Sequence, residues 1–149
     1  MSRNTIRIMF ALCVALPLSF AAATGGAAFA KSQLSAGLNQ SLERTTENGA
    51  FRVMIASPRS PIPLRQIHGW SVQVTDRAGR PVTGATFKVG GGMPQHGHGL
   101  PTAPTVQSAG PAGAYLLNGM KFSMNGWWEL KLNIQSPAGP DQVTFNVVL

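Results

Sequence analysis

The segment from Gly90 to Thr102 carries the residues of this sequence that are best suited to chemistry. It reads Gly-Gly-Gly-Met-Pro-Gln-His-Gly-His-Gly-Leu-Pro-Thr and contains two of the three histidines in the chain, His96 and His98. Two neutral imidazoles separated by one residue can reach one metal ion where the backbone is extended or turned between them. Met93 adds a thioether just upstream. The pattern predicts a metal site with His96, His98 and Met93 as its first candidate ligands.

Two more methionines and one more histidine extend this candidate site. Met120 and Met124 belong to the segment Gly-Met-Lys-Phe-Ser-Met, where their even spacing places both on one side of a strand. His68 stands just before Trp70 at the expected start of a strand and ranks last as a ligand. Imidazole and thioether without thiolate suit copper, above all Cu(I), better than zinc or calcium. Copper is therefore the expected cofactor.

A metal-free role for the same residues remains as an alternative. Histidines in a glycine-rich loop can hydrogen-bond backbone groups that the loop would otherwise leave bare, and methionines often fill cores. The protein would then be an extracytoplasmic interaction module with structural histidines. The proline-rich segment 57–63 and the loop 93–113 would form its binding surface on a rigid scaffold.

Catalysis is not expected, because the residues that usually perform it are few and scattered. Asp76 and Asp141 stand in turn-like sequence, where aspartate caps backbone groups. The serines lack a recognisable nucleophile turn. The glycine run 90–92 lacks the lysine and the following helix of a phosphate-binding loop. We therefore expect a protein that is not an enzyme.

The first 30 residues have the three parts of a secretory signal. Arg3 and Arg7 supply the positive start, residues 8–20 supply the apolar stretch, and Ala-Phe-Ala at 28–30 supplies the cleavage pattern. We expect cleavage, with no membrane span afterwards and a periplasmic or secreted mature protein. Retention as an uncleaved anchor is the alternative. Cys13, the single cysteine, would leave with the signal, which excludes disulfides and thiolate metal sites.

Chain length and charge limit the number of domains and the kinds of partner that we expect. Residues 31–149 suffice for one domain and are too few for two. The formal net charge is +7, but charged residues make up only 11% of the chain and the basic ones form no run. A nucleic-acid partner is not expected, because its footprint would cluster.

The period of the apolar residues changes from helical to two along the chain. Residues 31–49 are expected to form a short helix and linker, because leucines recur there every four residues before Asn48-Gly49. From residue 50 onward, apolar and polar residues alternate as in half-buried strands. The expected strands cover 51–55, 70–75, 85–89, 115–122, 127–134 and 143–147. The glycine- and proline-rich stretch 90–114 is expected to be a long connection with little regular structure.

Six or seven short strands without a long helix between them predict an all-β fold. We expect residues 50–149 to form an antiparallel, immunoglobulin-like β-sandwich. Without an inter-sheet disulfide, aromatic packing around Trp70, Trp127 or Trp128 must stabilise its core.

Several motifs of this domain resemble the FixH-like/YtkA-like family of secreted bacterial β-sandwich proteins. The motifs are His68-x-Trp70, Gly79-Arg80-Pro81-Val82-x-Gly84-Ala85, Gly91-Gly92-Met93-Pro94-x-His96-x-His98-Gly99-Leu100-Pro101 and Gly119-Met120-Lys121-Phe122-x-Met124-x-Gly126-x-Trp128. The resemblance implies an extracytoplasmic domain without known enzymatic activity. Some relatives are linked to copper handling or to the assembly of copper-containing respiratory oxidases.

The resemblance also implies ligands and a kind of partner. The ligand candidates are again Met93, His96 and His98, joined by Met120 and Met124. The partner would be an extracytoplasmic protein that accepts or donates copper. FixH-type members carry a membrane anchor, whereas a cleavable signal is expected here, and this difference argues against a direct role in a membrane oxidase assembly complex.

Overall fold

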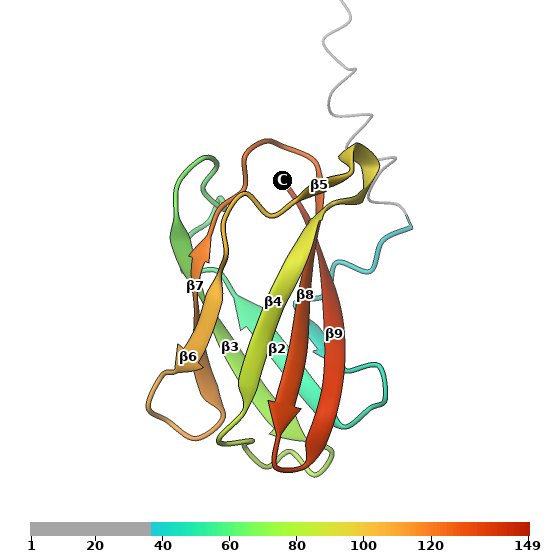
Figure 1. The fold of residues 1–149 in the computed structure, drawn as a ribbon, viewed down its shortest axis with the longest axis vertical. Coiled ribbons are helices and arrows are strands. Elements are labelled where there is room, and N and C mark those ends of the chain that lie inside the picture. Colours follow the sequence, from blue (N-terminus) through green and yellow to red (C-terminus); the bar gives the residue numbers. More distant parts are fainter. Residues whose placement is uncertain (1–36) are drawn as a thin grey trace, which may run out of the picture.

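Two antiparallel sheets packed face to face form the protein in a computed structural model that describes residues 37–149 (Figure 1). The first sheet has the order β1-β2-β3-β7-β6, with β1 at Glu43–Thr45, β2 at Phe51–Ala56, β3 at His68–Asp76, β7 at Ala114–Met120 and β6 at Thr105–Ser108. The second sheet has the order β5-β4-β8-β9, with β5 at His98–Gly99, β4 at Thr86–Met93, β8 at Trp127–Ser136 and β9 at Gly139–Val148. The predicted all-β, immunoglobulin-like sandwich is confirmed.

The central strands form where apolar and polar residues alternate along the sequence. In β2, Phe51, Val53 and Ile55 are buried, and the residues between them are exposed. Strand β8 follows the same rule, because each apolar side chain from Trp128 to Ile134 faces the opposing sheet. These positions occupy one side of a pleated strand, so the two inner faces close into a single core.

Aromatic side chains fill one end of this core. The rings of Trp70, Phe122 and Trp128 lie in sequence, with centroids 6.3 Å apart for the first pair and 5.3 Å for the second. Trp70 and Trp128 are buried as predicted, whereas Trp127 is only partly buried and donates its indole N–H to Asn146. The aromatic end is also where β4, β7 and the start of β3 bring the candidate metal ligands (Figure 1).

The expected helix over residues 31–49 is wrong for the part that the structure describes. Residues 37–49 contain strand β1 instead, which pairs with β2 through Arg44 and Val53. Residues 39–47, here named the N-terminal strap, also reach β9 in the other sheet. There, Arg44 donates to the carbonyl of Thr144 at 2.6 Å. The predicted signal, residues 1–30, lies outside the described residues.

The stretch 90–114 is more regular than expected. Strand β4 continues to Met93, a 3-10 turn follows at Pro94–His96, and β5 and β6 then complete the edges of the two sheets. Glycine and proline are poor strand residues, but pairing with β4 and β7 overrides this weak local preference. Across residues 37–149, helices of the length and apolar character needed to cross a membrane are absent.

Candidate functional site

The hairpin between β4 and β5 presents the two histidines of the predicted site. Gly92 pairs with Gly99, and Met93 pairs with His98. Gly92 has a φ of +153°, and a side chain there would collide with the carbonyl oxygen of His98. The glycine therefore allows β5 to approach β4 closely enough to fold back after one 3-10 turn.

His96 and His98 are both exposed, and their rings are neighbours at the surface. Their centroids lie 6.2 Å apart, and the ring planes are inclined by 37°. A metal–imidazole bond of about 2 Å places a ring centre about 3 Å from the ion, so two rings on one ion have centres within about 6 Å. The observed 6.2 Å is slightly above this limit, so one ion would fit only between rings on nearly opposite sides of it, after a small movement of either ring.

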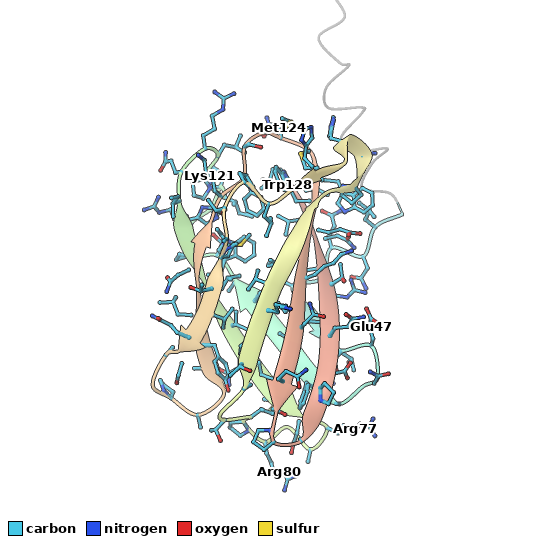
Figure 2. All side chains as sticks on the ribbon, in the orientation of Figure 1. Glu47, Arg77, Arg80, Lys121, Met124 and Trp128 are labelled. Atoms are coloured by element: carbon cyan, nitrogen blue, oxygen red, sulfur yellow. The ribbon has the colours of Figure 1, made fainter. Side chains whose placement is uncertain are left out.

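Met124 lies in the loop between β7 and β8, at the same end of the sandwich as the hairpin (Figure 2). Its side chain is 42% exposed, and its carbonyl accepts a hydrogen bond from the indole N–H of Trp128 at 3.1 Å. Gly126 further fixes this loop by exchanging two backbone hydrogen bonds with Leu149. The thioether of Met124 is thus held at the surface by an ordered backbone.

Met93 lies between these two segments. Its side chain is buried, and its terminal methyl group would stand 2.8 Å from a β-carbon on Gly126. Gly126 also has a φ of +133°, which favours glycine. Met93 therefore packs against the loop that carries Met124 and joins it to the histidine hairpin.

Met120 is placed differently from Met124, although both were predicted on one side of a strand. Met120 ends β7, is fully buried and pairs across the sheet with His68. The predicted ligands thus form an exposed group of His96, His98 and Met124 and a buried pair of Met93 and Met120.

The chemistry of a metal site at this end would depend on methionine sulfur. Within residues 37–149, no three histidine, cysteine, aspartate or glutamate side chains come close enough to hold one ion together. Glu129 pairs with Gly92 along the sheet, but its carboxylate is 2.9 Å from Lys131. Two imidazoles and one thioether form a neutral, soft donor set, which fits Cu(I) and fits hard dications poorly.

The two aspartates expected in turns bind backbone groups away from this end. Asp76 accepts hydrogen bonds from the backbone N–H groups of Ala78 and Arg80, and bonds from Arg80 hold the pKa of its carboxyl below the usual value. Arg80 lies at the opposite end of the sandwich from Met124 (Figure 2). The predicted capping role is confirmed for Asp76.

Asp141 accepts hydrogen bonds from backbone groups, as predicted, but the turn expected around it is wrong. It belongs to β9, not to a turn, and is 6% exposed. Burial alone would raise the pKa of Asp141, but hydrogen bonds from Thr46 and from the backbone N–H groups of Asn48, Ala50 and Gln142 lower it to about 2. The carboxylate thereby ties residues 46–50 to the second sheet.

A separate surface hollow lies beside the proline-rich loop. It has a volume of about 370 Å³ and lies over the start of β3, lined by Ala56, Ser57, Pro58, Gly69, Trp70, Ser71 and Leu116. Its lining is uncharged. Part of the surface predicted for a metal-free interaction module is therefore concave.

Comparisons with known proteins agree with this architecture. The model of the YtkA-like family matches residues 46–133, a range that includes all five predicted ligands. Among solved structures, a DUF4426 family protein from Pseudomonas aeruginosa PAO1 is similar, with a TM-score of 0.50 and 18% identity. The match covers 68% of this chain and 91% of that one, and at this identity it supports the fold alone. No curated protein matches the chain.

Proposed function

The chain belongs to the YtkA-like family, and from this premise we propose that it is an exported, non-enzymatic protein that binds Cu(I). The metal would be held at the end of the sandwich and passed to, or taken from, an extracytoplasmic partner protein. Export is supported by the signal-like residues 1–30. The periplasm or the cell exterior is the compartment that follows.

One observation carries the copper proposal: two exposed imidazoles, His96 and His98, have ring centres 6.2 Å apart. Each ring can turn a nitrogen toward an ion between them. Met124 is an exposed thioether at the same end, so it can supply a third, soft donor. Met93 and Met120 are buried, and either would have to move toward the surface to join these ligands.

Exposure of the ligands fits transfer better than storage. A partner can reach His96, His98 and Met124 without opening the core, because none of the three is buried. Their neutral donor set also adds no charge that would hold a dication. Ligand exchange with a second protein then requires only that its donors replace those of the hairpin one at a time.

The test is a Cu(I) titration of the protein recovered from the periplasm of a bacterial host, in competition with a coloured chelator. We expect one equivalent to be retained at the surface site and lost when both His96→Gln and His98→Gln are introduced. Gln95→Ala, in the same exposed turn, is the matched control and should bind as the parent does. The mass of the recovered protein tests the cleavage of the signal, because a cleaved protein has the mass of residues 31–149.

The competing function is a metal-free interaction module. The observation that favours it is the uncharged hollow of about 370 Å³ beside Pro58. Unchanged chelator absorbance with the parent protein, or equal retention of copper by the double histidine variant, would contradict the surface copper site and favour this role.

A further inference from the structure

His68 is an unusual member of the aromatic end of the core. It is the first residue of β3, it is only 8% exposed, and its register partner across the sheet is Met120. Its ring centroid lies 5.6 Å from that of Phe122 and 6.4 Å from that of Trp70. The imidazole thus points into the sandwich and not into solvent.

The hydrogen bonding of His68 fixes which ring nitrogen is free. Nδ1 is 3.0 Å from the carbonyl oxygen of Gln66, and a carbonyl only accepts, so Nδ1 carries the proton. In the neutral ring, Nε2 then presents a lone pair. This atom is buried and has no hydrogen-bond partner among residues 37–149. A histidine whose Nδ1–H is bonded to a backbone carbonyl is oriented as metal-ligating histidines usually are.

Met120 brings a soft donor to the same place. Directly paired residues of an antiparallel sheet have β-carbons about 5 Å apart on one face, and Met120 is fully buried. The rings of Phe122 and Trp70 lie beside the imidazole of His68, and the faces of aromatic rings attract cations. A lone pair, a thioether and aromatic walls form a poor environment for a hydrated dication and a suitable one for a dehydrated monovalent ion.

We propose that His68 Nε2 and the thioether of Met120 are ligands of a second, internal Cu(I) site beneath the surface pair. The choice of copper rests on the proposed function, whereas the place of the site rests on the unpaired Nε2. Met93, the last residue of β4 in the opposing sheet, is also buried in the core, beside Gly126. The protein would then hold two copper ions, one exchangeable at His96 and His98 and one enclosed.

A buried water is the competing explanation for the free nitrogen. Trp70 Nε1 is also buried without a partner, and it can only donate, whereas His68 Nε2 can only accept. One water could therefore satisfy both atoms. In that case the pair would be structural, and added metal would leave His68 unchanged.

The test follows the imidazole nitrogens of the exported protein by NMR during titration with Cu(I). The protein has three histidines, so the signals of His68 follow the internal site and those of His96 and His98 follow the surface site. In the variant carrying His96→Gln and His98→Gln, we expect one equivalent still to bind and to shift the Nε2 resonance of His68. Met120→Leu should abolish that shift while the signals of His96 and His98 still respond, because leucine conserves the core volume and removes the sulfur.

Met54→Leu is the matched control, since Met54 is 48% exposed on the outer face of β2 and should leave both sites intact. An Nε2 resonance of His68 that stays fixed at saturating Cu(I) would overturn the internal site, even if the surface pair responds. A shift of His68 with silent signals from His96 and His98 would support the internal site and contradict the surface one. Both outcomes are measured on the parent protein, so the test remains decisive even if a variant does not fold.

Discussion

Replacing Asp141 by asparagine should destabilise the protein at neutral pH and remove part of its sensitivity to acid. The carboxylate accepts hydrogen bonds from the backbone N–H groups of Asn48, Ala50 and Gln142. Asparagine has the same shape, but its amide group would point a donor at one of these donors. The mutant therefore loses either the hydrogen bond from Ala50 or the hydrogen bonds from Asn48 and Gln142, and at least one backbone N–H group stays unpaired.

The magnitude follows from the pKa of Asp141, which falls from 3.8 to about 2 on folding. At about 1.4 kcal/mol per pH unit, this difference corresponds to about 2.5 kcal/mol of stability. The carboxylate borders a surface hollow that Asn48 and Gln142 also line, so water screens it and about 1–2 kcal/mol is the expected value. Because folding lowers this pKa, the contribution is complete above about pH 4 and is lost as the pH falls toward 2.

The assay is urea unfolding of the parent and of Asp141→Asn at pH 7, 4 and 3, followed by tryptophan fluorescence. We expect a difference of about 1–2 kcal/mol at pH 7 that shrinks at pH 3. Asp76→Asn is the matched control, because it makes the same exchange at an exposed cap and should cause a smaller loss. A difference that is equal at all three pH values would refute the linkage, and no difference at pH 7 would refute the role of the carboxylate.

Two substitutions test other parts of the structure. Tyr115→Phe removes a hydroxyl that donates to the carbonyl of Val82 at 2.8 Å and accepts from the N–H of Ala85 at 3.1 Å; we expect a loss of about 1–3 kcal/mol in urea unfolding, and an unchanged midpoint would contradict it. Gly92→Ala introduces a side chain against the carbonyl of His98 at a φ of +153°. It should shift the β4–β5 hairpin and weaken Cu(I) retention, and chelator competition equal to that of the parent would argue against this dependence.

The strands of the core could be predicted because burial on one face leaves a period of two in the sequence. The same rule could have revealed the position of His68. Extending the alternation of Trp70, Val72 and Val74 back by one step reaches His68, which is indeed buried. Its unpaired Nε2, however, depends on the carbonyl of Gln66 and on the rings around it, and these contacts come from the folded chain.

The errors arose where pairing overrides local preference. Leucines four residues apart predicted a helix before residue 49, yet β1 forms because β2 offers a strand edge to Arg44 and its neighbours. The sequence also did not reveal that Met120 is buried and Met124 exposed, because Met120 ends a strand and Met124 lies in the loop after it. Even spacing predicts a shared face only while the strand continues.

The N-terminal strap has a consequence for self-association. Strand β9 is ten residues long and lies at the edge of the second sheet, where unpaired backbone groups could recruit a strand from another molecule. Arg44 and the N–H of Glu47 bind the carbonyls of Thr144 and Gln142, so these acceptors are already taken. The strap thus covers part of the longest edge strand of the sandwich, and its removal would free these carbonyls to accept hydrogen bonds from a strand of another molecule.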